Sequence, residues 1–255
     1  MIEGIIDTHA HYDDEKFDFI RHATLSSLEA LGVRGIVNCS SSVESSYFSV
    51  ELSQIYDFVF AAVGVHPHDA DNLSDGWRDS LEDLLKTPKV VAVGETGLDY
   101  FYDNSPREIQ LEVFYEQIRL SLNHSLPLVV HDRDAHEDIL KALEIFKPKA
   151  VVHRYSGDAE LARKLTDLGV YLGFGCAVTY PDSKNEIESV KSIPIEYLLL
   201  ETDAPYLPPY NLRGRICTSD MISVAAEKIA EIRGDYSPKQ IVDIAAENAC
   251  RLFNF

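Results

Sequence analysis

Eight short apolar runs, most of them rich in β-branched residues, recur along this chain and constrain its fold more than any other feature. They cover residues 4–9, 34–39, 58–66, 89–95, 126–131, 149–153, 170–175 and 197–203. Most are continuous rather than alternating, as expected for strands that are buried on both faces of a parallel sheet. Eight strands that alternate with helices over about 250 residues predict a (β/α)₈ TIM barrel, and one such domain accounts for residues 1–255.

The segments between these runs show helical patterns. In residues 106–123, apolar side chains recur at three- and four-residue spacing, which places them on one face of a helix. Ser105-Pro106 predicts an N-cap serine followed by a proline at the first helical position, and Ser237-Pro238 repeats the arrangement. A doubly wound open sheet is the alternative fold. It fits less well, because no Gly-rich phosphate loop follows the first apolar run.

Side chains that can bind metal follow five of the runs, at the point where each run ends. They are His9, His11, Glu95, His131, His153 and Asp203. His9 and His11 are two residues apart on an extended chain and therefore point the same way. In a closed parallel barrel the carboxyl ends of all strands meet at one mouth. We therefore expect these six side chains to lie together, although each taken singly could be a polar residue where a buried strand leaves the core.

Four imidazoles and two carboxylates exceed what one tetrahedral ion needs, and they suit two divalent ions about 3.5–4 Å apart. The expected ligands are His9, His11 and Asp203 at one ion, His131 and His153 at the other, and Glu95 between the two. Such donors admit Zn²⁺, Mn²⁺, Fe²⁺ or Ni²⁺. Asp203 and Glu95 are the predicted catalytic residues, with Asp203 accepting a proton from the attacking water.

Four residues near the same mouth are predicted to bind substrate: His66, Arg133, Arg213 and Arg215. The forked guanidinium group of an arginine suits two phosphate oxygens. Arg154 is a further arginine of this kind, because it directly follows the predicted ligand His153. His66 and His68 could contact phosphate or donate a proton to a leaving group. The aromatic residues 100–102 could stack on bases. The alternatives are solvated loop arginines, histidines that order their own turn, and aromatic side chains that cap the barrel rim.

Charge and cysteine usage limit the partners and the compartment. Asp and Glu number 42 against 23 Lys and Arg, which gives a formal net charge of −19. This excess disfavours a protein that coats nucleic acid, but not a nuclease whose bound metals supply local positive charge. The four cysteines form no C-x-x-C pair, and neither a signal peptide nor an apolar run of transmembrane length is evident. We therefore expect a cytoplasmic protein with reduced thiols, no membrane association and no obligate protein partner.

Six motifs in order resemble the TatD-type metal-dependent hydrolases, a family of amidohydrolase-like TIM barrels. They are H-x-H at 9–11, G-V-H-P-H at 64–68, G-E-x-G-L-D-Y at 94–100, L-P-x-x-x-H-x-R at 126–133, H-x-x-S-G at 153–157 and E-T-D-A-P-Y-L-x-P at 201–209 followed by R-G-R. The resemblance implies a two-metal, magnesium-dependent deoxyribonuclease with 3′-to-5′ exonuclease activity on single-stranded DNA ends, and the choice between DNA and RNA stays open. It also implies that the six strand-end side chains are metal ligands.

One loop departs from the family pattern, which continues R-G-x-x-N-x-P. Here Cys217 and Ser219 replace the asparagine and the proline, so the substrate preference of this chain is open. A dinuclear hydrolase of a small amide, ester or lactone is therefore the alternative function, because a fold does not fix its substrate. A metal-binding scaffold without catalysis is a third hypothesis, which the intact ligand set disfavours.

Overall fold

All eight apolar runs form strands of one parallel sheet in a computed structural model that describes residues 2–255. The strands are β1 (Ile5–Ala10), β2 (Val33–Cys39), β3 (Val59–Val63), β4 (Val90–Asp99), β5 (Leu128–Arg133), β6 (Ala150–Val152), β7 (Tyr171–Phe174) and β8 (Leu198–Leu200). Each strand pairs with the next one along the chain. The predicted (β/α)₈ barrel is confirmed, and the doubly wound alternative is wrong.

The first and last strands close the barrel. Ala10 and Ala204 form a parallel bridge. The backbone N–H of Asp203 donates to the carbonyl of His9 at 2.9 Å, and that of His11 donates to the carbonyl of Ala204 at 2.7 Å. Because these bonds join the segments that carry the predicted ligands, the closure also fixes where Asp203 lies relative to the two histidines.

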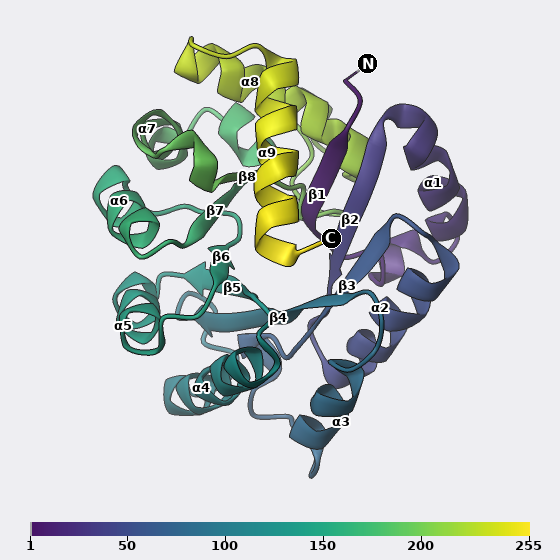
Figure 1. The fold of residues 1–255 in the computed structure, drawn as a ribbon, viewed down its shortest axis with the longest axis vertical. Helices are drawn as coiled ribbons and strands as arrows, with labels where there is room; N and C mark the ends of the chain where they lie inside the picture. The colour runs from purple at the N-terminus through teal and green to yellow at the C-terminus, as the bar shows by residue number, and fades with distance from the viewer. Residues whose placement is uncertain (1) are drawn as a thin grey trace.

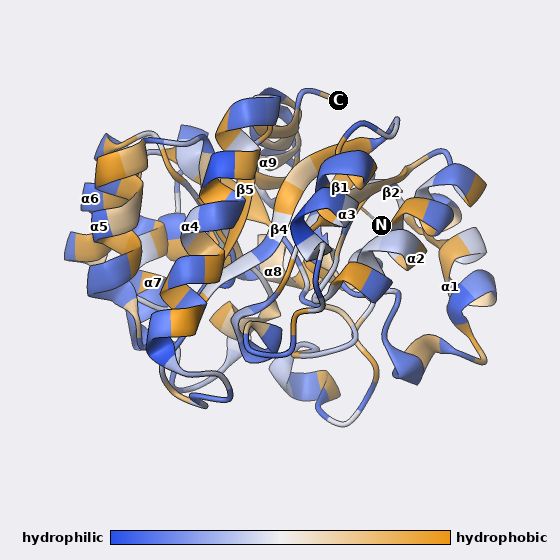
Figure 2. Cartoon of the chain, turned by 90° about the horizontal axis from the view of Figure 1, so that it is seen from below, coloured by the Kyte–Doolittle hydropathy of each residue, from blue (hydrophilic) through white to orange (hydrophobic). Residues whose placement is uncertain are grey.

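Helices surround the barrel (Figure 1). They are α1 (Arg21–Leu28), α2 (Val43–Ile55), α3 (Trp77–Leu84), α4 (Arg107–His124), α5 (His136–Phe146), α6 (Ala159–Asp167), α7 (Lys184–Ser192), α8 (Ile222–Arg233) and α9 (Pro238–Phe253). Short 3-10 helices lie in the loops: η1 (Glu15–Phe17), η2 (Glu29–Leu31), η3 (Pro67–Asp69), η4 (Cys176–Thr179), η5 (Ile195–Tyr197), η6 (Tyr210–Leu212) and η7 (Ser219–Met221). Several of these helices show both apolar and polar faces (Figure 2), as expected for helices that pack one side against a sheet.

One of the two predicted helix caps is present. Ser237 caps α9 through a reciprocal capping box with Gln240. The prediction for Ser105 is wrong, because α4 begins at Arg107 with Pro106 as its N-cap. The buried hydroxyl of Ser105 instead donates to the backbone carbonyl of His68 at 3.0 Å. Ser105 therefore fastens the loop after β3 rather than the helix.

The barrel interior is filled by apolar side chains from the strands together with the end of α9. This cluster comprises Ile6, Val37, Cys39, Ala62, Val91, Ala92, Val129, Val151, Leu199, Ala249, Leu252 and Phe253. Residues two apart on a strand share a face, so the face that buries Val129 also carries His131, and the face that buries Val151 continues to His153. The predicted ligands therefore sit on top of a packed core, and α9 lies across the barrel in the view of Figure 1.

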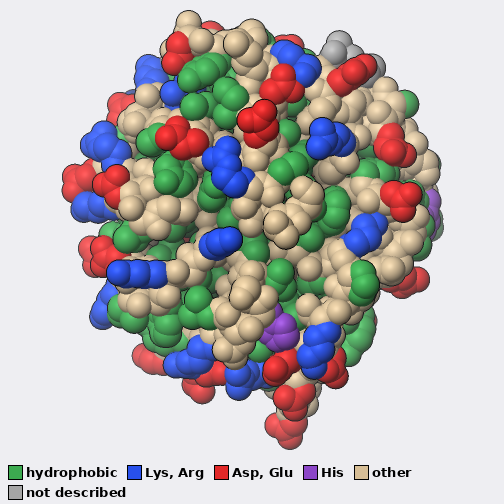
Figure 3. Space-filling view, in the orientation of Figure 1, with side chains coloured by type: hydrophobic (Ala, Val, Ile, Leu, Met, Phe, Trp, Pro, Cys, Tyr) green, Lys and Arg blue, Asp and Glu red, His purple; other side chains and the backbone are tan. Residues whose placement is uncertain are grey.

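The face on which α9 lies shows Lys and Arg side chains interspersed with Asp and Glu (Figure 3). It offers no broad basic surface of the kind that coats nucleic acid. Among residues 2–255, no helix combines the length and the apolar character that crossing a membrane requires.

Candidate metal centre

Glu95 lies at the centre of the predicted ligand set and is buried. Its Oε1 lies 2.8 Å from both His131 Nδ1 and His153 Nε2. Its Oε2 lies 3.4 Å from His9 Nε2 and 3.5 Å from His11 Nε2. The two oxygens of one carboxylate therefore face two separate pairs of imidazoles, which is the arrangement a carboxylate needs to bridge two ions.

Asp203 completes the group around the first histidine pair. Its Oδ1 lies 3.8 Å from His9 Nε2 and 3.4 Å from His11 Nε2, and the two imidazole nitrogens are 3.0 Å apart. The donor atoms of these three residues all lie within 4.8 Å of one another. Asp203 adopts a left-handed backbone conformation with φ of 66°, held by its N–H bond to the strand-β1 carbonyl. The structure thus brings the ends of the first and last strands of the barrel together.

Ring nitrogens of four imidazoles point toward this centre, and they can bind a divalent ion once they have lost their protons. His11 Nδ1 donates to the carbonyl of Cys39 at 2.8 Å, so Nε2 is the nitrogen that faces the centre and can bind a cation after deprotonation. His131 Nε2 donates to Asp99 Oδ2 at 3.1 Å, and its Nδ1 donates to Glu95 Oε1 at 2.8 Å in the metal-free protein. An outer partner that fixes the tautomer is a regular feature of histidine ligands. These donors therefore suit the metals that an imidazole and carboxylate set admits.

His66 belongs to a second group of three side chains that could hold a metal ion, although the sequence analysis did not predict it as a ligand. His66, Glu95 and His131 also have donor atoms within 4.8 Å of one another, with His66 Nε2 lying 3.5 Å from Glu95 Oε1. The remaining group is His9, Glu95 and His153. His66, predicted to bind substrate, thus lies within reach of the metal centre itself.

Asp99 is a buried carboxylate whose role the sequence did not reveal. Its Oδ2 accepts hydrogen bonds from His131 Nε2 and from His68 Nε2, the latter at 2.9 Å. Its Oδ1 accepts the backbone N–H groups of Phe101 and Tyr102. Burial alone would raise the pKa of Asp99, but these hydrogen bonds hold its pKa well below the usual range. Asp99 is therefore an ionised anchor that joins a candidate ligand to a histidine of the neighbouring loop.

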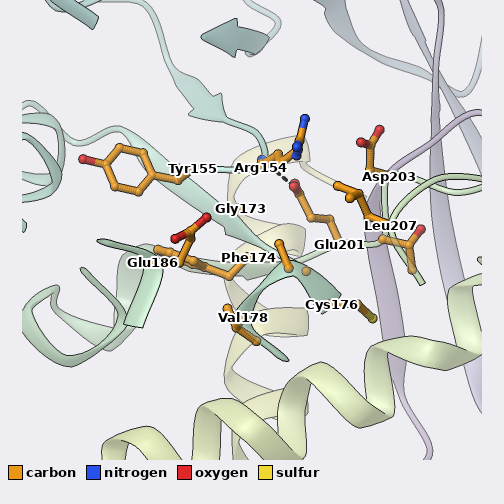
Figure 4. A pocket seen from close by; sticks show the side chains of 13 residues that line it. Arg154, Tyr155, Gly173, Phe174, Cys176, Val178, Glu186, Glu201, Asp203 and Leu207 are labelled. Carbon is orange, nitrogen blue, oxygen red and sulfur yellow. Dashed lines mark hydrogen bonds between the residues drawn. The ribbon is translucent and has the colours of Figure 1, made fainter. Parts of the chain in front are cut away.

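Glu201 is a second buried carboxylate behind the centre (Figure 4). It lies 3.8 Å from His153 Nδ1 and accepts the backbone N–H of Arg154. A side chain on Gly173 would collide with the Glu201 carboxylate, so only glycine leaves room for it. Burial raises the pKa of Glu201 well above its ordinary value. Glu201 therefore holds the segment that carries His153 and faces the ring nitrogen that points away from Glu95.

Replacing Glu201 by Gln is expected to weaken metal binding by about 10- to 100-fold, because outer partners orient and polarise histidine ligands. The measurement is a competition titration of the metal-free protein against a chelator. Glu186→Gln is the matched control, since Glu186 lines the same small cavity without contacting a candidate ligand. Equal affinities of the two variants would show that Glu201 has no part in metal binding.

The histidines have strongly divergent pKa values in the metal-free protein. Burial, together with repulsion from His153, lowers the pKa of His9 to about 4. Burial would also lower the pKa of His11, but Asp203 and Glu95 raise it to about 10. For His131, Asp99 and Glu95 outweigh burial and raise the pKa to about 9. At neutral pH two of the candidate ligands therefore carry protons that a metal ion must displace.

Metal affinity is accordingly expected to rise with pH. His11 and His131 become neutral as the pH rises toward about 9 to 10, so each displaced proton adds about tenfold in apparent affinity per pH unit below those values. Calorimetric titration with Mn²⁺ between pH 6 and pH 8 tests this, and buffers with different ionisation enthalpies count the released protons. An affinity that stays constant across this range would contradict the assignment of these histidines as ligands.

The candidate ligands open into a cavity of about 680 Å³. Its lining includes His66, His68 and Tyr102, as well as Asp13 and Asp14. Two of the predicted substrate-binding arginines, Arg133 and Arg213, line an adjoining cavity of about 580 Å³ instead. Arg215 is exposed and lines neither of these two cavities. The predicted substrate residues are thus spread over two cavities and the surface.

The two residues that depart from the family pattern are buried and lie outside both cavities. The N–H of Cys217 donates to the carbonyl of Pro205 at 3.0 Å. Ser219 Oγ lies 2.8 Å from the buried hydroxyl of Tyr12, to which the Ser219 N–H also donates at 3.1 Å. These residues therefore fasten the loop after β8 to the segment after β1.

Comparison with known proteins identifies the family. A family model described as TatD related DNase matches residues 6–254. The uncharacterized metal-dependent hydrolase YabD of Bacillus subtilis is 38% identical over 252 residues, which cover 98% of each chain. The crystal structure of YjjV, a TatD homolog from Escherichia coli, superposes with a TM-score of 0.93 at 31% identity and full coverage of both chains. This chain therefore belongs to the TatD-related family and is a metal-dependent hydrolase.

Proposed function

We propose that this protein is a deoxyribonuclease that removes nucleotides from the 3′ ends of single-stranded DNA with the help of two divalent metal ions. The observation that carries the proposal is the position of Glu95, whose two oxygens face separate histidine pairs at 2.8 to 3.5 Å. The description of the matching family as TatD related DNase supports phosphodiester bonds as the target. Mg²⁺ is the proposed working ion, with Zn²⁺, Mn²⁺ or Ni²⁺ as other occupants of the same donors.

Two such ions would supply Lewis acidity, which activates water and neutralises charge on the phosphate. The residues of the chain would do the rest. Asp203 would orient the attacking water and accept its proton, since its carboxylate is ionised and lies at the edge of the histidine group. His66 has a pKa well below its ordinary value because it is buried, so it is a neutral donor or acceptor for a phosphate oxygen. His68, held by Asp99, would face the leaving group.

The proposal is tested with end-labelled single-stranded DNA and the purified protein, supplied in turn with Mg²⁺, Mn²⁺ and Zn²⁺. Release of mononucleotides from the 3′ end is expected, and label at either end establishes the direction of degradation. The Asp203→Asn variant, purified in the same way, should be nearly inactive, which would show that the activity does not come from a contaminating nuclease. An RNA oligonucleotide of the same sequence separates DNA from RNA specificity. If a known exonuclease degrades the DNA under these conditions and this protein does not, the proposal fails.

Hydrolysis of a small amide, ester or lactone is the second candidate function. The volume of the cavity at the metal centre, about 680 Å³, lies within the range of small-molecule sites. The net charge of −19 also repels a long polyanion. A panel of esters, amides and lactones that is turned over faster than DNA would favour this function over the nuclease.

The same proposal includes a cytoplasmic location and activity without an obligate protein partner. All four cysteines are free thiols, and Cys39, Cys176 and Cys217 are buried, which is the usage expected in a reducing compartment. A fluorescent fusion expressed in the native host tests the location.

A further inference from the structure

Three arginines without ion pairs line the cavity of about 580 Å³ that adjoins the metal centre. They are Arg133, Arg154 and Arg213. Within residues 2–255 the arginine ion pairs are made by other residues, namely Arg21, Arg78, Arg107, Arg119 and Arg233. A chain with 42 acidic and 23 basic residues thus leaves three guanidinium groups unpaired around one hollow. Such groups are available for an anionic ligand.

Aromatic rings flank two of these guanidinium groups. The Arg213 guanidinium lies 5.7 Å from the ring centre of Tyr180 and 5.9 Å from that of Tyr210. The centres of the two tyrosine rings are 5.5 Å apart and the rings are inclined at 72°, and Tyr210 is 45% exposed. Arg133 stacks on Phe101 at 4.7 Å, and its buried Nε has no hydrogen-bond partner. The lining of the cavity therefore includes two tyrosine rings and an arginine whose Nε has no hydrogen-bond partner.

Arg154 links this cavity to the metal centre, because it lines both. It follows His153 directly and has a left-handed backbone conformation with φ of 44°. The Glu201 carboxylate accepts its backbone N–H, which holds the main chain in place (Figure 4). A ligand that spans Arg154 would consequently reach from the candidate metal ligands into the second cavity.

Two carboxylates, Asp182 and Glu186, also line the cavity. With three arginines the local balance is still positive, in a chain whose net charge is −19. Local positive charge of this kind concentrates anions at a cleft even on an acidic protein.

We propose that this arginine–tyrosine cavity binds the nucleotide adjacent to the scissile bond of a single-stranded oligonucleotide. The proposal rests on the proposed nuclease function and adds a subsite to it. Arg154 and Arg213 would bind the backbone phosphate, because a guanidinium offers a fork of donors to two phosphate oxygens. Tyr210 would stack on the base, which tolerates any base because every base has a flat face. The subsite would thus favour an oligonucleotide over a phosphodiester that occupies the metal centre alone.

Steady-state kinetics with two substrates test the subsite. One substrate is a single-stranded oligonucleotide, and the other is bis(p-nitrophenyl) phosphate, a phosphodiester that contains no nucleotide. Arg213→Ala and Tyr210→Leu are expected to lower kcat/KM for the oligonucleotide by about 5-fold to 100-fold, the range expected for loss of a stacked base. The same variants should lower kcat/KM for bis(p-nitrophenyl) phosphate by a clearly smaller factor, because this substrate has no base to stack and no neighbouring backbone phosphate. Tyr210→Phe, which keeps the ring, should retain oligonucleotide activity.

Arg163→Ala is the matched control, since Arg163 is exposed on α6 and its removal changes the net charge equally. Arg213→Ala, unlike this control, should also reduce the dependence of oligonucleotide binding on salt by about one phosphate contact. Equal effects of Arg213→Ala and Arg163→Ala, or equal losses on both substrates, would overturn the subsite.

Binding without hydrolysis separates this proposal from the nuclease function. Fluorescence anisotropy in the presence of EDTA measures the affinity for a labelled oligonucleotide, and Arg213→Ala should weaken it even if the protein cleaves no DNA. Absence of hydrolysis of both substrates by the unmodified protein would refute the nuclease function. Oligonucleotide affinity that is unchanged in the Arg213 and Tyr210 variants would refute the subsite alone.

Discussion

Replacing Asp203 by Asn is expected to lower kcat for DNA hydrolysis by about 10²- to 10⁴-fold, the usual contribution of a general base. Asparagine has nearly the same size and keeps one oxygen near His11, which lies 3.4 Å from the carboxylate in the native protein. It cannot accept the proton of the attacking water. End-labelled single-stranded DNA provides the rate, and elemental analysis of the variant shows whether both ions remain bound.

Asp243→Asn is the control, because Asp243 is exposed on α9 and pairs only with Lys239. A kcat for Asp203→Asn within threefold of the native value would remove Asp203 as the base. If, in addition, the native protein is no more active than the variant, the metal-binding scaffold without catalysis becomes the favoured hypothesis.

Replacing Glu95 by Gln is expected to have the larger effect on metal content. An amide is uncharged and has one oxygen, so it cannot face both histidine pairs as the carboxylate does at 2.8 to 3.5 Å. Bound metal should fall from two ions to one or fewer, and activity should drop by about 10³-fold or more because electrostatic stabilisation is lost with the ions. Elemental analysis and circular dichroism distinguish loss of metal from loss of fold.

Glu95→Asp provides the comparison, since it retains the charge but shortens the reach. It should keep more metal than Glu95→Gln. Two ions bound with native affinity in Glu95→Gln would contradict the bridging role and with it the two-metal proposal.

The strand-end residues could be predicted because they interrupt long apolar runs. A carboxylate such as Glu95 after Val-Ala-Val-Gly is conspicuous, and parallel strands bring all such ends to one mouth. The register of the strands could not be predicted. Strand β4 continues to Asp99, beyond the predicted end at Glu95, and its Gly97 lies opposite His131 in β5. This pairing brings Asp99 to His131 Nε2, the ring nitrogen that points away from Glu95.

Glu201 shows a second reason why sequence reasoning stops short. It follows the last apolar run directly, as a candidate ligand would, but its carboxylate lies behind His153 and needs the space that Gly173 leaves. The approach of Glu201 to His153 Nδ1 depends on how β7 packs beside β8. The spacing of apolar residues in the sequence gives no information about this packing. The same holds for the three arginines, whose convergence on one cavity depends on loops from separate parts of the chain.

The hydrogen bonds between the segments after β1 and β8 have a consequence for biosynthesis. His9 and His11 leave the ribosome early, whereas Asp203 is added only after the eighth strand has been made. A nascent chain therefore carries these two imidazoles without the Asp203 carboxylate through most of its synthesis. Divalent ions held by His9, His11 and Asp203 would tie the opening and closing strands of the barrel together, so removal of metal is expected to destabilise the folded protein.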